Sequence, residues 1–101
     1  MTPRSELSPK KLEEAAKRLK AMAHPLRIAI IELLQKNKRL TVTQIYERLH
    51  LEQAITSHHL GILKDKGVLV AFREGKNIYY ELKHEQISNI IDCLNRCGSN
   101  F

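Results

Sequence analysis

The chain of 101 residues is 43% hydrophobic and 28% charged, which predicts one globular domain and excludes a disordered or low-complexity protein. No apolar run is long enough to cross a membrane, and residues 1–11 lack the apolar segment of a signal peptide, so we expect a cytoplasmic protein without a membrane partner. The net charge of +6 is compatible with a polyanionic partner, and two cysteines are too few for a disulfide framework.

The first predicted helix occupies residues 8–24. Ser8 followed by Pro9 is a helix-start pair, because serine caps the first turn and proline fits the first helical position. Pro25 interrupts the helix, and residues 1–7 before it are expected to be flexible. One face is rich in alanine and could cover the core of its own chain or pack against a second copy. Its members are Leu12, Ala15, Ala16, Leu19, Met22 and Ala23.

A second helix begins at Pro25 and runs towards a basic polar loop at residues 36–39, after which Leu40 can make a short strand contact. Its apolar residues cover much of its circumference, which is typical of the central helix of a small core. They are Leu26, Ala29, Ile30, Leu33 and Leu34, with Ile28 and Ile31 beside them.

Residues 41–67 show the pattern of two helices joined by a tight turn. Thr41 and Gln44 form a capping-box pair, which predicts a helix through about Leu49. Residues 50–52 make a three-residue turn, and a second helix follows. Two short helices around a tight turn are typical of a helix-turn-helix.

The second helix of this pair, within residues 51–67, has two chemically different sides. Helical spacing predicts a buried side made of Thr56, His59, Leu60 and Leu63, widened by Ile55 and Ile62. Gly67 supplies the left-handed residue that ends the helix. Small or hydrogen-bonding side chains, of the kind that can reach into a DNA major groove, occupy the start of the opposite side, and a cation lies further along. These residues are Gln53, Ala54, Ser57, His58 and Lys64.

Residues 68–82 alternate with a period of two, which predicts a β-hairpin with Gly75 in its turn. The tip projects Arg73, Lys76 and Asn77, which could approach phosphates or a minor groove or could form an ordinary solvated turn. A cationic hairpin directly after a helix-turn-helix is typical of the wing of a winged-helix domain.

The last predicted helix, residues 85–97, carries four large aliphatic residues on one face, and little chain is left to cover them. We therefore expect residues 8–24 and 85–97 to form a homodimer interface. In such a dimer the helices within residues 51–67 of the two subunits would lie about one DNA turn apart and could both read base edges. The aliphatic residues are Ile87, Ile90, Ile91 and Leu94. The predicted fold class is mostly α with a small β-hairpin. It is a single winged helix-turn-helix domain over residues 1–101, with about five helices and a two-stranded wing.

Three strings in this order closely resemble the ArsR/SmtB family of bacterial transcriptional repressors: AMAHPLRIAIIELL, SHHLGILKDKGVLV and REGKNIYYEL. The resemblance extends from about Leu12 to Leu94. It implies a homodimeric winged-helix repressor that binds double-stranded DNA at a promoter and releases it when an inducer or a modification alters the dimer.

The resemblance also implies roles for individual residues. On the second helix of the helix-turn-helix, base edges would be faced by Gln53, Ala54, Ser57 and His58. On the wing, Arg73 and Lys76 would face the DNA backbone, and Thr41, Thr43 and Gln44 could add phosphate contacts. His59 is expected to be a half-buried packing residue.

The chain departs from the family pattern at residues 55 and 56. Members usually have a polar residue followed by an aliphatic one, whereas this chain has Ile55 followed by Thr56. Ile55 could therefore contact a thymine methyl group instead of the core.

The second departure from the family pattern concerns the residues that bind an inhibitory metal. Many family members bind an inhibitory metal through cysteines on the first helix of the helix-turn-helix, but VTQIYERL contains none. Others use a site on the last helix, and the matching positions here are His84, Gln86, Cys97 and Asn100. Only His84 and Cys97 readily bind a transition metal, which falls short of a tetrahedral site unless two subunits share ligands. We expect no metal site and no cofactor.

Cys93 and Cys97 lie four residues apart, on one face of the last helix. One interpretation is that they are small apolar residues packed at the dimer interface. The alternative is a redox or persulfide switch, although an intrahelical disulfide would require local unwinding.

The patterns predict a sequence-specific DNA-binding transcriptional regulator, and the resemblance implies that it is a homodimeric repressor. Residues 1–39 hold most of the positive charge, with ten Lys or Arg and four Glu, whereas residues 40–80 hold five cationic and four acidic residues. The weak charge of the reading region leaves open a winged-helix protein-interaction module without specific DNA binding. An enzyme is not expected, because no carboxylate pair, nucleophile with base or phosphate-binding glycine loop appears.

Overall fold

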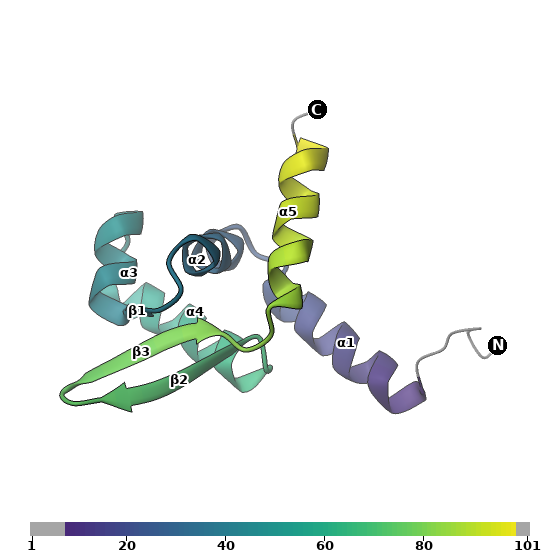
Figure 1. Ribbon diagram of the computed structural model, residues 1–101, viewed down its shortest axis with the longest axis horizontal. Coiled ribbons are helices and arrows are strands. Elements are labelled where there is room, and N and C mark those ends of the chain that lie inside the picture. Colours follow the sequence, from purple (N-terminus) through teal and green to yellow (C-terminus); the bar gives the residue numbers. More distant parts are fainter. Residues whose placement is uncertain (1–7, 99–101) are drawn as a thin grey trace.

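The computed structural model describes residues 8–98, which form five helices and one antiparallel sheet (Figure 1). The prediction that residues 1–7 are flexible lies outside the described residues. The helices are α1 (Pro9–Met22), α2 (Pro25–Lys36), α3 (Val42–Leu49), α4 (Gln53–Asp65) and α5 (Gln86–Gly98), and the strands are β1 (Leu40–Thr41), β2 (Leu69–Glu74) and β3 (Asn77–Leu82). No helix in this part of the chain is both long and apolar enough to cross a membrane.

The two N-terminal helices begin as the sequence predicts. The Ser8 hydroxyl accepts a hydrogen bond from the Lys11 N–H at 3.3 Å, and Pro9 is the first residue of α1. His24 caps α2, because its Nδ1 accepts the Leu26 N–H at 3.1 Å. The first helix ends at Met22, shortly before the predicted end near His24, because His24 has extended backbone angles and caps the next helix.

The predicted helix-turn-helix is confirmed as α3 and α4. The capping box is complete: the Thr41 N–H donates to Gln44 Oε1 at 2.9 Å, and the Gln44 N–H donates to Thr41 Oγ1 at 3.2 Å. His50 adopts the left-handed conformation with φ of 55°, which turns the chain sharply between the helices. Gly67, with φ of 78°, adopts the left-handed conformation just after the end of α4, as predicted.

The wing is confirmed, and the sheet has one strand more than the predicted pair. The strand order is β1-β3-β2, and Leu40 pairs with Tyr80 while Thr41 pairs with Tyr79. The contact expected of Leu40 is thus made with the far strand of the hairpin. Gly75 occupies the turn with φ of 65°, because glycine enters this conformation without a steric penalty.

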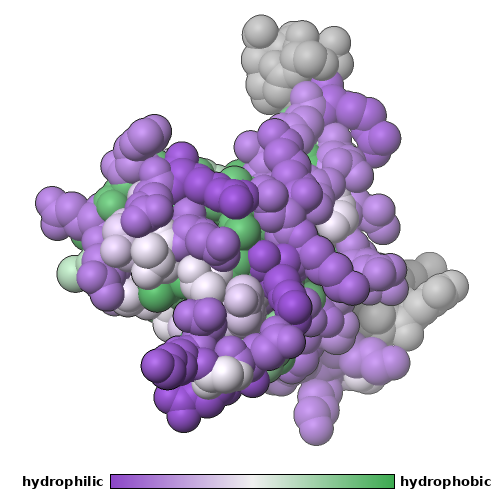
Figure 2. All heavy atoms as spheres, turned by 60° about the vertical axis from the view of Figure 1, so that its left-hand side comes forward, coloured by the Kyte–Doolittle hydropathy of each residue, from purple (hydrophilic) through white to green (hydrophobic). Residues whose placement is uncertain are grey.

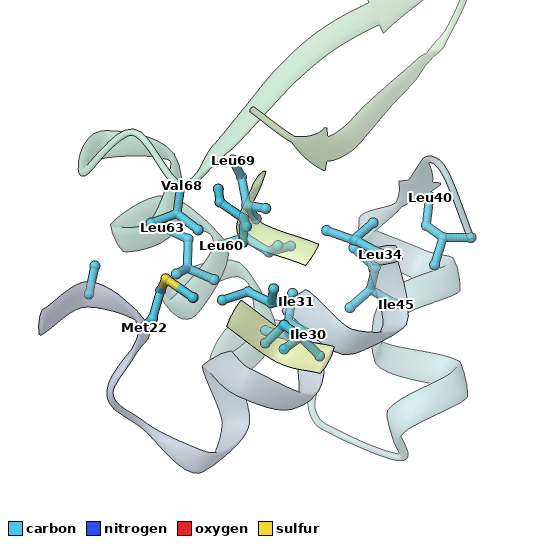
Figure 3. Close-up of a cluster of buried hydrophobic side chains, with 13 residues drawn as sticks. Met22, Ile30, Ile31, Leu34, Leu40, Ile45, Leu60, Leu63, Val68 and Leu69 are labelled. Carbon is cyan, nitrogen blue, oxygen red and sulfur yellow. The ribbon is translucent and has the colours of Figure 1, made fainter. Parts of the chain in front are cut away.

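One cluster of thirteen buried hydrophobic residues forms the core, and α2 lies at its centre (Figure 3). The inward residues of α2 are Ile30, Ile31 and Leu34, each at most 2% exposed. The cluster is completed by residues from every other helix, from β1 and β2, and from the link between α4 and β2: Ala21, Met22, Leu40, Ile45, Leu60, Leu63, Val68, Leu69, Ile87 and Ile91. The prediction that this helix is the central one is confirmed.

The apolar faces of α1 and α5 are only partly covered. Ile87 and Ile91 belong to the core of their own chain, whereas Ile90 and Leu94 are 37% and 47% exposed. The interpretation of all four aliphatic residues as an uncovered face is therefore wrong for Ile87 and Ile91, because α5 packs one edge on α2. Leu19 of α1 is also exposed, at 55%. Both helices extend from the side of the molecule opposite the wing tip (Figure 1).

Candidate nucleic-acid interface

The orientation of α4 is set by its inward side. Thr56, Leu60 and Leu63 have no exposed surface and His59 is 7% exposed, so the predicted buried side is confirmed. His59 is more deeply buried than expected. The Thr56 hydroxyl donates to the Glu52 carbonyl at 3.0 Å, which satisfies the one hydroxyl that this side buries.

The opposite side of α4 is open to solvent over the residues that the sequence assigned to reading DNA. All of them are exposed: Gln53, Ala54, Ser57, His58 and Lys64. Because the inward residues are fixed in the core, this side presents a defined set of side chains. An exposed helix of 13 residues with small and polar groups at its start has the dimensions to enter a major groove.

Ile55 does not widen the buried side of α4. It is 40% exposed, so its assignment to the core stripe is wrong. The buried side is centred on Thr56, His59, Leu60 and Leu63, and Ile55 lies at its edge, where the core does not cover it. An exposed isoleucine beside Ala54 supplies an apolar surface among polar neighbours.

A groove of about 540 Å³ separates the start of α3 from the wing. Its walls are formed by residues 41–44 on one side and residues 76–79 on the other. The fold thus brings Thr43, Gln44 and Lys76 to one groove, so they are candidates to contact the same stretch of DNA backbone. Thr41 Oγ1 and Gln44 Oε1 already accept capping hydrogen bonds, so the Thr41 hydroxyl hydrogen and the Gln44 side-chain amide are the donors left for a ligand.

Arg39 fastens the wing, a role that sequence reasoning missed. Its Nη1 lies 2.7 Å from Glu74 Oε2. Its guanidinium carbon also lies 5.6 Å from the centre of the Phe72 ring and 4.9 Å from that of Tyr79, and these two rings stack 5.9 Å apart. We call Arg39, Phe72, Glu74 and Tyr79 the wing clamp. No local signal in the sequence connects a loop cation with a hairpin more than 30 residues away.

The wing tip is polar and exposed, in agreement with the prediction for Arg73, Lys76 and Asn77. Figure 2 shows polar side chains over much of the face that carries the wing and α3, with smaller hydrophobic patches between them. Arg39 offsets the negative charge of Glu74 next to this tip, so the ends of the hairpin strands carry an excess of cations.

Arg27 and His59 form the second contact that sequence reasoning missed. Arg27 Nε donates to His59 Nδ1 at 3.1 Å, and Arg27 Nη1 donates to the Ala21 carbonyl at 3.1 Å. Burial lowers the pKa of His59, and the neighbouring His24, Arg27 and His58 lower it further. His59 is therefore held neutral near pH 7, in keeping with its role as acceptor.

The two cysteines are exposed on α5. A hydrogen bond with Cys93, together with the charge that Cys93 can carry, raises the pKa of Cys97. A raised pKa reduces the thiolate fraction, and the thiolate is the reactive form. The interface interpretation and the redox hypothesis for this pair both remain predictions.

Metal binding has no assembled site in the described part of the chain. Within residues 8–98, no group of three or more His, Cys, Asp or Glu side chains lies close enough together to hold a metal ion. His84 and Cys97 are exposed, near opposite ends of α5. The fourth matching position, Asn100, lies outside the described residues.

The arrangement of α3, α4 and the three-stranded sheet defines a winged helix-turn-helix protein. A model of the bacterial regulatory protein arsR family matches residues 24–70. The transcriptional repressor PagR of Bacillus anthracis is 44% identical over 84 residues, which cover 83% of this chain and 84% of PagR. The transcriptional activator HlyU of Vibrio cholerae is 33% identical and covers 81% of this chain and 77% of HlyU.

Solved structures agree with these sequence matches. The crystal structure of PagR superimposes with a TM-score of 0.81 at 41% identity and covers 86% of this chain and 99% of that one. The homodimeric winged helix-turn-helix DNA-binding domain Mb0332 of Mycobacterium bovis has a TM-score of 0.80 at 25% identity, covering 98% and 91% of the two chains. The chain belongs to the ArsR family and is a winged helix-turn-helix transcriptional regulator.

Proposed function

We propose that this protein is a homodimeric repressor that binds a two-fold-related promoter site in the cytoplasm and acts by binding, without catalysis. The observation that carries the proposal is the division of α4 into a buried side and an exposed polar side. A helix whose inward side is fixed can present Gln53, Ala54, Ser57 and His58 to base edges in one register. Repression is favoured by the identity with PagR, which is named a repressor.

Within this proposal the DNA backbone is contacted from two sides of the groove between α3 and the wing. Lys76 and Arg73 supply cations from the hairpin, and Thr41, Thr43 and Gln44 supply hydrogen-bond donors from the start of α3. Lys64 provides a further cation towards the C-terminal end of α4. Contacts to the DNA backbone set the position of the protein on the duplex, whereas contacts to the bases select the sequence.

The homodimer is supported by the apolar residues that one chain leaves uncovered. Leu19 on α1 and Ile90 and Leu94 on α5 are each more than a third exposed. The domain from Mycobacterium bovis, which shares the fold, is described as homodimeric. We propose that residues 8–24 and 85–97 form the interface, so sedimentation of the purified protein should give twice the mass of one chain.

The central test is fluorescence anisotropy of the reduced protein with a duplex from its own upstream region, compared with a scrambled duplex across a salt series. A preference of at least about 1,000-fold is expected, together with a steep loss of affinity as salt rises. No preference and a flat salt dependence would contradict the proposal. That result would favour a protein-interaction module, for which an apolar helix-in-groove contact changes little with salt.

A further inference from the structure

One guanidinium joins three helices at the inward side of α4. Arg27 lies in the first turn of α2, its Nη1 reaches the Ala21 carbonyl near the end of α1, and its Nε reaches His59 in the middle of α4. Leu60 and Leu63 hold α4 by apolar packing, which has little directional preference. The bond between Arg27 and His59 is directional, so it adds to this packing a constraint on the position of α4 along and around its own axis.

The chemistry of this bond requires one protonation state. Arginine carries donors only, so the Nδ1 of His59 must be the acceptor and the ring must be neutral, with its hydrogen on Nε2. A proton added to Nδ1 would replace the acceptor by a donor and set a positive ring against a guanidinium. Both changes break the contact.

Within residues 8–98, every group that acts on the pKa of His59 lowers it, so each disfavours a positive ring. The His24 ring, from the link between α1 and α2, lies 4.6 Å from the His59 ring, centre to centre. The His58 ring, on α4 itself, lies 5.5 Å away. With Arg27 of α2, these are the charged or titratable groups that act on His59 within residues 8–98, and none is a carboxylate.

Displacing His59 would move the reading side of α4. Ser57 and His58 directly precede His59 on one rigid helix, so a small rotation at residue 59 shifts both relative to the wing and to a second subunit. Base readout depends on the fit of each side chain to a base edge, so a shift of this kind weakens specific binding first.

We propose that Arg27 is a positioning residue that holds α4 against α1 and α2 through His59, and that acid weakens specific DNA binding by protonating His59. This inference rests on the DNA-binding function proposed above. It identifies a pH-dependent regulation of the same site, carried by two residues that do not touch DNA.

The test compares four proteins by anisotropy on the specific duplex between about pH 8 and about pH 5.5, at one salt concentration, the range in which histidines titrate. The proteins are the wild type, His59→Asn, Arg27→Gln and the control His84→Gln, which removes an exposed histidine in the link before α5. The side-chain oxygen of asparagine can accept from Arg27 in place of Nδ1 and does not titrate.

The wild type and His84→Gln should lose affinity about tenfold or more as the pH falls, as expected for the loss of a charge-assisted hydrogen bond. His59→Asn should bind like the wild type at about pH 8 and lose much less in acid. Arg27→Gln should bind weakly at both ends of the range. Identical pH profiles for the wild type and His59→Asn would overturn the inference, whereas absence of binding by the wild type at about pH 8 would overturn the proposed function.

The free energy of unfolding provides a readout without DNA and shows whether each variant folds. Because the pKa of His59 is lowered in the folded protein, the unfolded chain binds more protons, so acid favours unfolding. This contribution is complete above about pH 6.5 and is lost as the pH falls through the lowered pKa. His59→Asn should therefore lose less stability in acid than the wild type, and equal losses would count against the inference.

Discussion

The two regions proposed to touch DNA are held in opposite ways. The reading helix α4 is anchored by side chains with no exposed surface, Thr56, Leu60 and Leu63, whereas the wing is fastened near its tip by Arg39 and Glu74, which are 44% and 56% exposed. Buried apolar contacts are not screened by salt, whereas exposed ion pairs are weak and salt-dependent. The comparison indicates a rigid base-reading element beside a wing that can adjust to the backbone.

The largest effect is expected from the anchor of α4. Leu60→Ala should reduce the free energy of unfolding by about 2–5 kcal/mol, because it leaves a cavity in a fully buried position. Denaturant unfolding at one protein concentration measures this loss. Ile55→Ala on the exposed side of the same helix is the control and should cost less than about 1 kcal/mol. Similar costs for both variants would mean that the two sides of α4 do not differ as the structure has them.

The base-reading role of α4 predicts an effect on specificity. Ser57→Ala or Gln53→Ala should cost roughly 1–3 kcal/mol of binding free energy on the specific duplex and little on random DNA, since each removes a contact to a base edge. Anisotropy with both duplexes measures the difference. Equal losses on the two duplexes would contradict a base-reading role.

Substitutions in the wing should affect affinity for all DNA and leave specificity unchanged. Lys76→Ala should weaken binding to specific and random DNA alike and reduce the salt slope by about one, because one phosphate contact is lost. Lys10→Ala on α1, which removes the same charge far from the groove, is the matched control and should leave the slope unchanged. A loss confined to the specific duplex would assign Lys76 to base readout instead.

Among these variants, the smallest effect on the free energy of unfolding is expected from a substitution in the wing clamp. Arg39→Gln should cost less than about 1 kcal/mol of unfolding free energy, because the side chains of Arg39 and its ion-pair partner Glu74 are both largely in solvent. DNA binding should nevertheless weaken, since the Glu74 carboxylate is left uncompensated beside the wing tip. Adding Glu74→Gln to this variant should restore part of the affinity. If the double variant binds no better than Arg39→Gln alone, repulsion by Glu74 is not the cause.

Local signals in the sequence determined the elements and the sides of α4. The start of α1 at Ser8, the Thr41–Gln44 capping box and the turn at Gly75 each depend on hydrogen bonds or backbone angles within a few residues. Such features are readable because the interacting groups are neighbours in the chain. The spacing of Thr56, His59, Leu60 and Leu63 was likewise sufficient to predict which side of α4 is buried.

The contacts that hold these elements together became visible with the three-dimensional fold. Arg27 contacts His59, 32 residues further along the chain, and Arg39 of the basic loop at residues 36–39 pairs with Glu74. The strand β1 pairs with β3 and adds a third strand to the sheet. The division of the aliphatic residues of α5 between the core and the surface also depends on where α2 lies. Local patterns in the chain were therefore sufficient to predict a winged helix-turn-helix whose second helix has an exposed polar side. The contacts that position this helix and the wing depend on the packing of distant segments, which no local pattern encodes.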